Sequence, residues 1–138
     1  MSTATAASPA STPRAVVDAS VVVRAYLGRY DLAARWLESV VSWPSLVYVE
    51  VPHALLRLQR QQRISLGQAR VALQSLHALV ADVHPVESLA PQAWDTALAR
   101  GLSAYDACYV VLAETLDVPL VTADRRLAAA TPNAILLA

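Results

Sequence analysis

Residues 102–127, LSAYDACYVVLAETLDVPLVTADRRL, contain the pattern that decides the fold. Ser103 is a good N-cap and begins a predicted helix, and the apolar run at 119–122 is typical of a short buried strand. Asp124, two residues beyond that run, begins a second and shorter predicted helix. Parallel strands are joined by helical crossovers and covered on both faces, so a buried strand between two helices predicts a parallel sheet.

The same alternation of short apolar runs and longer amphipathic segments continues through the rest of the chain. We predict strands at 15–17, 46–49, 82–86, 119–122 and 135–137. We predict helices at 19–27, 31–42, 51–63, 66–80, 91–100, 103–116 and 124–130, the fourth of them introduced by a Ser65–Gln68 capping box. The fold class is therefore α/β, with a roughly five-stranded parallel sheet flanked by helices on both faces.

The composition fits one folded domain without a membrane span. The 138 residues are 56% hydrophobic and 16% charged, which excludes a disordered or fibrous protein. No apolar stretch approaches the ~18 residues that a transmembrane helix needs. Residues 1–14 are nearly all Ala, Ser, Thr and Pro, so we expect a disordered tail, without an apolar signal segment, before a folded domain at 15–138.

The inventory of reactive residues excludes several kinds of chemistry. All eleven basic residues are arginines, so P-loop phosphate binding and Schiff-base catalysis lack their lysine. Three widely spaced glycines do not supply a G-x-G-x-x-G dinucleotide loop. The single cysteine, Cys108, excludes an intramolecular disulfide and a cysteine-based zinc site, and it fits a reducing cytoplasm. Carboxylates remain as the candidates for chemistry.

Four acidic residues, here called the acidic quartet, stand at the boundaries of predicted elements. Asp18 and Glu50 directly follow predicted strands, Asp124 lies just beyond another, and Asp106 lies in the first turn of a helix. The carboxyl ends of parallel strands share one edge of a sheet, so three of the four are expected to meet there. Helix capping and helix-dipole interactions explain the same positions one at a time, and both interpretations stay open here.

A convergent quartet has to be neutralised, because four neighbouring carboxylates repel one another strongly unless a cation binds them or some of them become protonated. A site with only oxygen ligands suits Mg²⁺ or Mn²⁺. Such an ion positions a water molecule and stabilises the negative charge that develops on a phosphate.

Four segments of the chain carry a resemblance to a known family. They are residues 16–20 (VVDAS), 49–55 (VEVPHAL), 102–107 (LSAYDA) and 121–127 (VTADRRL). In order and spacing they resemble the signature blocks of PIN-domain ribonucleases, and most of all the VapC toxins of bacterial toxin–antitoxin pairs. The resemblance implies a PIN-like fold that binds Mg²⁺ or Mn²⁺, cleaves RNA endonucleolytically and is inhibited by a small cognate antitoxin.

The same resemblance assigns roles to individual residues. It makes the acidic quartet the catalytic carboxylates, acting as direct or water-mediated metal ligands. Ser20 and Thr122 would be hydroxyls that orient the pocket, although turn and cap hydrogen bonding explains them equally well. His53 stands where such proteins usually have Asn; it either replaces the hydrogen bond of that amide, which we favour, or adds a titratable group near the metal. Arg125 and Arg126 stand where some relatives have another acid, which leaves open whether one or two metals bind.

Arginines are the candidates for RNA contacts. Eleven arginines face eleven acids, and setting the acidic quartet aside leaves seven acids and a balance of +4. Arg57, Arg60 and Arg63 recur at three-residue intervals on one predicted helix, where they either contact phosphates or form a solvated face. Arg125 and Arg126, beside the last acid of the quartet, are the better candidates by position.

These observations favour a cytoplasmic, Mg²⁺- or Mn²⁺-dependent endoribonuclease that is the toxin of a toxin–antitoxin pair. Its expected partners are RNA and the antitoxin, with a homodimer as the assembly and no contact with a membrane. Leucines between residues 55 and 76 supply more apolar surface than one sheet face needs, and the resemblance implies an antitoxin groove there. The alternatives are an RNA-processing PIN nuclease without an antitoxin and a catalytically silent PIN module that binds protein or RNA.

Overall fold

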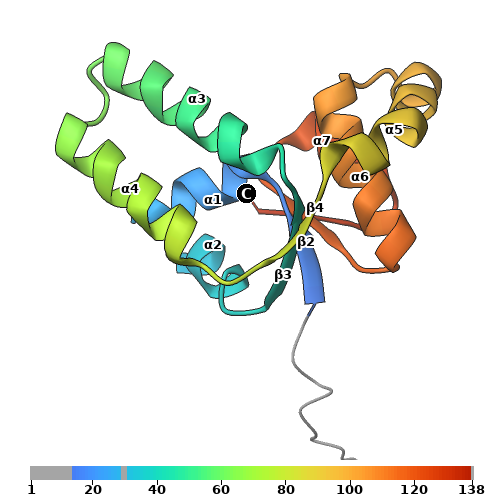
Figure 1. Ribbon diagram of the computed structural model, residues 1–138, viewed down its shortest axis with the longest axis horizontal. Coiled ribbons are helices and arrows are strands. Elements are labelled where there is room, and N and C mark those ends of the chain that lie inside the picture. The colour runs from blue at the N-terminus through green and yellow to red at the C-terminus, as the bar shows by residue number, and fades with distance from the viewer. Residues whose placement is uncertain (1–13, 29–30, 138) are drawn as a thin grey trace, which may run out of the picture.

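The structure, a computed structural model, describes residues 14–28 and 31–137 (Figure 1). The strands in these residues are β2 (Arg14–Val17), β3 (Val40–Pro44), β4 (Asp82–His84), β5 (Leu120–Thr122) and β6 (Ala134–Leu136). The helices are α1 (Ala19–Tyr26), α2 (Asp31–Trp36), α3 (Val47–Arg60), α4 (Leu66–Ala78), α5 (Val86–Arg100), α6 (Ala104–Leu116) and α7 (Arg125–Ala129). Residues 1–13 of the expected tail lie outside the described residues, and β2 begins at Arg14, one residue earlier than predicted.

The strands of the described residues form one parallel sheet in the order β4-β3-β2-β5-β6. The central strand β2 pairs with β3, where Val16 lies opposite Ser42, and with β5, where Val16 lies opposite Leu120. The predicted α/β fold with a five-stranded parallel sheet is therefore confirmed. This order also places the carboxyl ends of β2 and β5 side by side, at the kind of edge where ligands bind in parallel sheets.

Helices cover both faces of the sheet, as predicted. Figure 1 shows α1 to α4 on one side of the sheet and α5 to α7 on the other. Successive side chains of a strand point to opposite faces, so Val17 packs in the core beneath α1 to α4 and Val16 in the core beneath α5 and α6. Packing from both sides fixes β2 and the residue that follows it. Among the described residues, no helix combines the length and apolar character that crossing a bilayer requires.

The predicted strand at 46–49 is wrong. The second strand is β3, and Val47 instead begins helix α3. Val47, Val51 and Leu55 are spaced by four residues and are all buried, which is the period of a helix that lies against a core. A short apolar run with β-branched residues does not distinguish a strand from the first turn of a buried helix. Glu50 therefore lies in the first turn of α3 and not at the end of a strand.

The predicted helix at 31–42 is too long. Helix α2 ends at Trp36, and Val40 and Val41 belong to strand β3. The hydroxyl and the backbone N–H of Ser39 both donate to the Trp36 carbonyl oxygen, at 2.5 and 3.1 Å. A serine side chain that satisfies a backbone carbonyl in this way offers an alternative to helical hydrogen bonding, and the chain turns here into the strand.

Helix α5 begins at Val86, five residues before the predicted start at Pro91. Pro85 occupies the N-cap, and Pro91 lies inside the helix, where its missing N–H removes one helical hydrogen bond. Proline favours the first turn of a helix, so the pattern placed the start at the second of the two prolines. Gly101 ends the helix in the left-handed conformation (φ 68°), as predicted. The Ser65–Gln68 capping box of α4 is also confirmed.

Candidate active site

Asp18 follows β2 and caps α1, and both of its carboxylate oxygens accept hydrogen bonds. Oδ1 accepts from the backbone N–H groups of Ser20 (3.0 Å) and Val21 (3.3 Å) and from the Ser20 hydroxyl (2.5 Å). Oδ2 accepts from the Thr122 hydroxyl at 2.6 Å. Burial raises the pKa of this carboxyl, the hydrogen bonds lower it, and the charge of Asp106 raises it further. The side chain is buried and held in a single orientation.

Ser20 and Thr122 join the carboxyl ends of β2 and β5. Besides donating to Asp18, the Ser20 hydroxyl accepts from the Ala123 N–H at 3.1 Å. The Thr122 hydroxyl donates to the same carboxylate and accepts from the Asp124 N–H at 3.0 Å. These contacts span 103 and 104 residues of sequence. The two hydroxyls thus fix the position of Asp18 relative to Asp124, in addition to serving local turns.

Asp124 and Asp106 lie at the starts of α7 and α6. Oδ1 of Asp124 caps α7 by accepting from the N–H groups of Arg126 (2.9 Å) and Leu127 (3.4 Å). The N-cap of α6 is Ser103, whose hydroxyl accepts from the Asp106 N–H at 3.0 Å. Burial raises the pKa of the Asp106 carboxyl and the charge of Asp124 raises it further, against opposing effects of Ser103 and Arg126. The two carboxylates are therefore close enough to repel each other.

Glu50, from the first turn of α3, meets Tyr109 from α6. Burial raises the pKa of Glu50, the Tyr109 hydroxyl lowers it, and the charges of Asp106 and Asp18 raise it. Both Oε1 of Glu50 and the Tyr109 hydroxyl are buried, and among the described residues neither atom has a well-formed hydrogen bond. The tyrosine pKa lies well above its usual value because of burial and the neighbouring glutamate. This side of the site retains unused hydrogen-bonding capacity.

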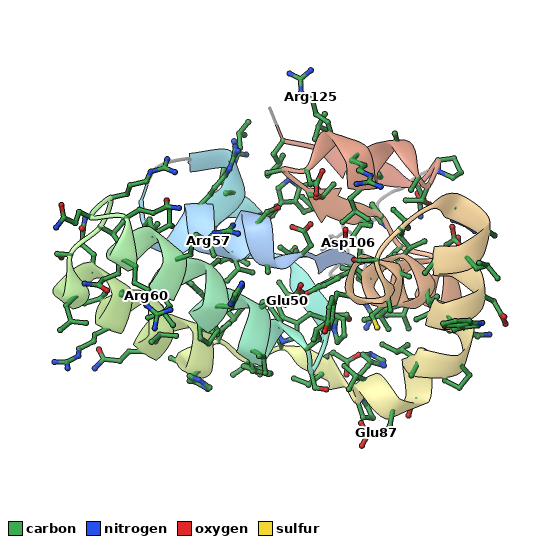
Figure 2. All side chains as sticks on the ribbon, turned by 90° about the horizontal axis from the view of Figure 1, so that it is seen from above. Glu50, Arg57, Arg60, Glu87, Asp106 and Arg125 are labelled. Carbon is green, nitrogen blue, oxygen red and sulfur yellow. The ribbon has the colours of Figure 1, made fainter. Side chains whose placement is uncertain are left out.

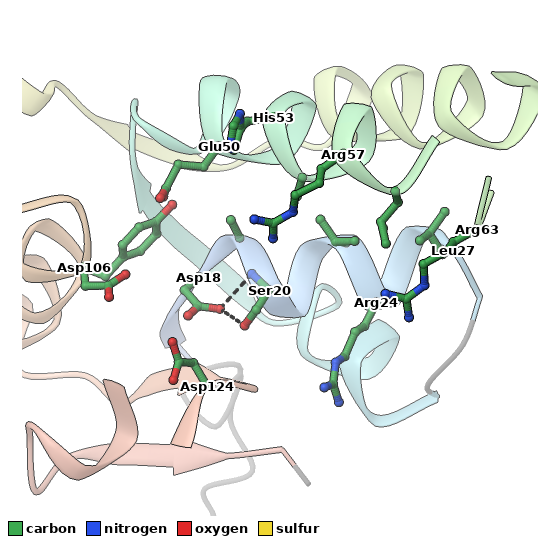
Figure 3. Close-up of a pocket in the computed structure, with 15 residues that line it drawn as sticks. Asp18, Ser20, Arg24, Leu27, Glu50, His53, Arg57, Arg63, Asp106 and Asp124 are labelled. Carbon is green, nitrogen blue, oxygen red and sulfur yellow. Dashed lines mark hydrogen bonds between the residues drawn. The ribbon is translucent and has the colours of Figure 1, made fainter. Parts of the chain in front are cut away.

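The acidic quartet lines one pocket of about 810 Å³, which is formed mainly by α1 and α3 and is bounded at one end by α6 and the start of α7. Figure 2 shows Glu50 and Asp106 facing this central space from opposite sides. Figure 3 shows the four carboxylates at one end, with arginines of α1 and α3 and of the α3–α4 connection farther along. The lining residues are Asp18, Ala19, Ser20, Val23, Arg24, Leu27, Glu50, His53, Ala54, Arg57, Leu58, Arg63, Asp106, Tyr109 and Asp124.

The donor chemistry of the pocket fits a divalent cation. Its acids offer only oxygen ligands, burial and mutual repulsion raise the pKa of three of them, and Oε1 of Glu50 is buried without a partner among the described residues. Within the same residues, no three His, Cys, Asp or Glu side chains are close enough to hold one ion by themselves. Mg²⁺ typically binds through one or two carboxylates and keeps several waters, which suits such a spread set.

The acids, the two hydroxyl residues and the histidine singled out from the sequence lie at this pocket. Ser20 and His53 line it together with the acidic quartet, and Thr122 lies behind Asp18. His53 is exposed and follows Glu50 by three residues on α3, which places the two on the same side of the helix. The error at 46–49 did not displace the glutamate from this edge, because α3 begins directly after the carboxyl end of β3.

The arginines predicted to bind RNA fall into two groups. Arg57 lines the pocket, whereas Arg60, Arg125 and Arg126 are not among its lining residues. Figure 2 shows Arg125 pointing away from the molecule, and the Arg126 guanidinium donates to the Gly101 carbonyl at 3.1 Å. The contact of these three side chains with RNA stays a prediction.

Two polar lining residues were missed by reasoning from the sequence. Arg24 follows Ser20 by four residues on α1, and Tyr109 follows Asp106 by three residues on α6. Side chains at these spacings share one face of a helix. Extending each motif by one helical turn toward the carboxyl end would have identified both.

The fold and the pocket define a member of the PIN-domain family. The PIN domain family matches residues 15–131, and the chain belongs to it.

Within that family the chain is of the VapC type. Ribonuclease VapC1 of Mycobacterium tuberculosis is 43% identical over 120 residues, which cover 83% of this chain and 89% of VapC1. Ribonuclease VapC9 of the same organism is 41% identical over 114 residues, which cover 81% of this chain and 87% of VapC9. The resemblance drawn from the four sequence segments is confirmed.

Solved structures share the fold. The crystal structure of PAE2754 from Pyrobaculum aerophilum has a TM-score of 0.72 at 31% sequence identity, covering 90% of this chain and 83% of that one. VapBC2 from Rickettsia felis, solved bound to a DNA fragment from its promoter, has a TM-score of 0.60 at 15% identity, covering 90% and 97%. The second likeness concerns the fold alone.

Proposed function

We propose that this protein is a divalent-metal-dependent endoribonuclease and the toxin of a toxin–antitoxin pair. The observation that carries the proposal is the convergence of carboxylates from the starts of α1, α3, α6 and α7 in one pocket. Their mutual repulsion destabilises the folded protein unless a cationic ligand offsets it. The support from relatives is the 43% identity to a protein named as a VapC ribonuclease.

In this proposal the acidic quartet holds Mg²⁺ or Mn²⁺ directly or through water. When bound, the cation supplies an activated water molecule and stabilises negative charge on the phosphate. The hydrogen bonds from Ser20 and Thr122 keep Asp18 in place, so it need not reorient when a ligand arrives. Glu50 has an unpartnered Oε1 within the described residues and can accept a proton or a hydrogen bond from water. His53, exposed on the same wall, can donate to a phosphate oxygen.

Cleavage of RNA by the purified protein tests this function. We expect cleavage with Mg²⁺ or Mn²⁺, none with EDTA, and a loss of roughly 100-fold or more in Asp106→Asn. This substitution keeps the backbone N–H that Ser103 caps, so α6 keeps its first turn. Asp95→Asn, at an exposed position of α5 outside the pocket, is the matched control. An Asp106→Asn protein as active as the wild type would contradict the site.

We further propose that an antitoxin covers apolar side chains on α3 and α4. Leu56 on α3 and Leu66 and Val71 on α4 are each about half exposed, at 45%, 54% and 58%. Co-expression with the product of a neighbouring reading frame should give a stable complex without ribonuclease activity. An active nuclease that no neighbouring product binds or inhibits would instead be an RNA-processing PIN nuclease without an antitoxin.

A homodimer and a cytoplasmic site of action complete the proposal. Trp94 and Leu98 lie one turn apart on α5 and are 67% and 76% exposed, an apolar surface that a second copy can cover. Light scattering should give the mass of a dimer, and Leu98→Glu should give a monomer that still cleaves RNA. A monomeric wild type at micromolar concentration would rule the dimer out. Action in the cytoplasm agrees with an RNA substrate and with the single free cysteine.

A further inference from the structure

The pocket has two chemically different ends. The acidic quartet surrounds one end, and Arg24, Arg57 and Arg63 line the rest of it. In Figure 3, Arg57 extends from α3 toward α1, and Arg63 lies beside Leu27 at the far end of α1. A phosphodiester strand is repelled by bare carboxylates, so an end that attracts phosphates has to bring the strand to the end that cleaves it.

The two helices that form most of the pocket, α1 and α3, share the same order of charges, with an acid at the start and an arginine near the end. Helix α1 begins at Asp18 and has Arg24 in its last turn, and α3 has Glu50 in its first turn and Arg57 in its second half. Figure 3 shows the two helices running in the same direction, side by side. At 1.5 Å per residue, Arg24 lies about 9 Å and Arg57 about 10.5 Å along the helix from its acid. The positive charges are therefore offset from the reaction centre in one direction.

Arg24 and Arg57 are available to a ligand. Among the described residues, neither guanidinium pairs with an acid, and the ion pairs that occur there are His84–Asp82 and Arg100–Glu114. Arg24 is half-buried and Arg57 is exposed. A guanidinium group can donate two hydrogen bonds to the oxygens of one phosphate. It is less strongly hydrated than an ammonium group, so the free-energy cost of its desolvation is smaller.

The walls between the arginines are apolar. Val23 of α1 and Leu27, the residue that follows α1, line the pocket on one side. Ala54 and Leu58 of α3 line it on the other. These side chains can cover a sugar or the face of an unpaired base, but they offer no donors or acceptors that distinguish one base from another. The contacts that favour binding at this end are thus mostly with the backbone of a single strand.

We infer that Arg24 and Arg57 form a phosphate-binding subsite for single-stranded RNA that lies on one side of the scissile bond only. The inference rests on the proposed ribonuclease function and adds a direction to it. RNA extends from the acidic quartet along α1 and α3, and a phosphate beyond the scissile one binds between the two arginines. Among the described residues that line the pocket, the strand on the other side of the scissile bond meets no comparable pair of arginines.

The salt dependence of RNA binding tests the subsite. Binding of a labelled single-stranded oligonucleotide is measured in an Asp106→Asn background, so that the RNA stays intact. Arg24→Gln and Arg57→Gln should each weaken binding by roughly three- to tenfold and reduce the slope of log K against log salt by about 0.7. Arg24→Lys and Arg57→Lys should restore the slope. Arg70→Gln, an exposed arginine of α4 outside the pocket, is the matched control and should change neither quantity.

The one-sided arrangement has its own readout. With Asp106 intact, substrates shortened from the 5′ or the 3′ end are compared. Removing nucleotides on one side should raise KM and make cleavage insensitive to Arg57→Gln, whereas shortening the other side should leave that sensitivity in place. Equal effects from both ends would overturn the inference, and so would arginine variants with an unchanged salt slope.

These outcomes separate the subsite from the function on which it rests. If the wild type does not cleave RNA in an Asp106-dependent way, the proposed function fails. If it does and the arginine variants bind RNA normally, only the subsite fails. Variants that keep RNA binding but release the antitoxin would show that this end of the pocket binds an acidic protein segment instead. Far-UV circular dichroism and the Tm of each variant exclude loss of folding as the cause.

Discussion

Asp18 caps α1 and also lines the pocket, so the proposed function gives this one side chain a structural and a chemical task. Burial raises its folded-state pKa above the unfolded value of about 3.8. A group with a raised carboxyl pKa binds more protons in the folded state, so its contribution to stability is greatest at low pH and is lost as pH rises through the folded value. At neutral pH the charge of Asp18 therefore opposes folding.

The substitution Asp18→Asn should separate these two tasks. Asparagine keeps an oxygen that can accept from Ser20 and Val21, and it removes the buried charge. We expect the Tm of the metal-free protein at pH 7 to stay the same or rise by a few degrees, while cleavage falls by roughly 100-fold. Thermal unfolding in EDTA and an RNA cleavage assay measure the two effects. A loss of several kcal/mol in the metal-free variant would mark the residue as mainly structural.

In the proposed function Tyr109 is a positioning residue, because it acts through Glu50. Tyr109→Phe removes a buried hydroxyl that has no well-formed hydrogen bond in the described residues, so the Tm in EDTA should hardly change. Glu50 loses the neighbour that stabilises its charged form, and the affinity for Mn²⁺ should fall by roughly tenfold. Isothermal titration calorimetry with Mn²⁺ checks this expectation. Equal loss of affinity and of metal-free stability would point to a packing defect.

At the scale of the helix, two serine caps offer a matched comparison. Ser103 caps α6, whose first turn carries Asp106, and Ser65 caps α4, which lies outside the pocket. Changing either serine to alanine should lower the free energy of unfolding by about 1 kcal/mol. Only Ser103→Ala should also reduce cleavage, because fraying of the first turn of α6 displaces a carboxylate. Urea unfolding and cleavage assays of both variants decide the point, and a Ser65→Ala protein with reduced activity would contradict it.

The helices and strands also show how much of the site could be predicted from the sequence. Caps and the Pro119–Thr122 strand are local signals, and they placed Asp106 and Asp124 correctly relative to their helices. The strand assigned to 46–49 failed because its apolar residues fit either a strand or a buried helical turn, and only packing against the sheet selects between them. Glu50 still reached the pocket, because a helix that starts after β3 begins at the same edge where a strand would have ended.

Contacts between side chains that are far apart in the sequence could not be predicted, for a different reason. The contact of Thr122 with Asp18 spans 104 residues, and no local pattern announces it. The interaction between the side chains of Tyr109 and Glu50 depends on how α3 and α6 pack on the two sides of the sheet. The arginines on α1 and α3 become one group only when those helices lie side by side.

For the whole molecule, the acids predict how stability depends on pH. Burial raises the folded-state pKa of Asp18, Glu50 and Asp106 above their ordinary values of 3.8 to 4.5. Each contribution to stability is therefore fully present below that range and is lost as pH rises through the raised values. The Arg100–Glu114 pair has the opposite sign, since the lowered pKa of Glu114 costs stability only as pH falls below its ordinary range.

We accordingly expect the Tm of the metal-free protein to fall as pH rises above the ordinary carboxyl range of 3.8 to 4.5. Saturating Mg²⁺ should raise the Tm more at pH 8 than at pH 5, because a ligand that binds the folded state stabilises it most when its carboxylates are ionised. Differential scanning calorimetry with Mg²⁺ or with EDTA at both pH values measures this. An increase of the same size at both values would contradict the coupling between the acidic quartet and the cation.

The central position of β2 in the sheet also has a consequence for folding during synthesis. β2 is the first described strand, yet its neighbour β5 and the residues Thr122 and Asp124 lie about a hundred positions later. A growing polypeptide thus carries Asp18 and Glu50 long before the other half of the pocket exists. Until β5 has been synthesised, one edge of β2 has no partner strand. A nascent or prematurely released chain that ends before Asp124 therefore cannot assemble the complete set of carboxylates.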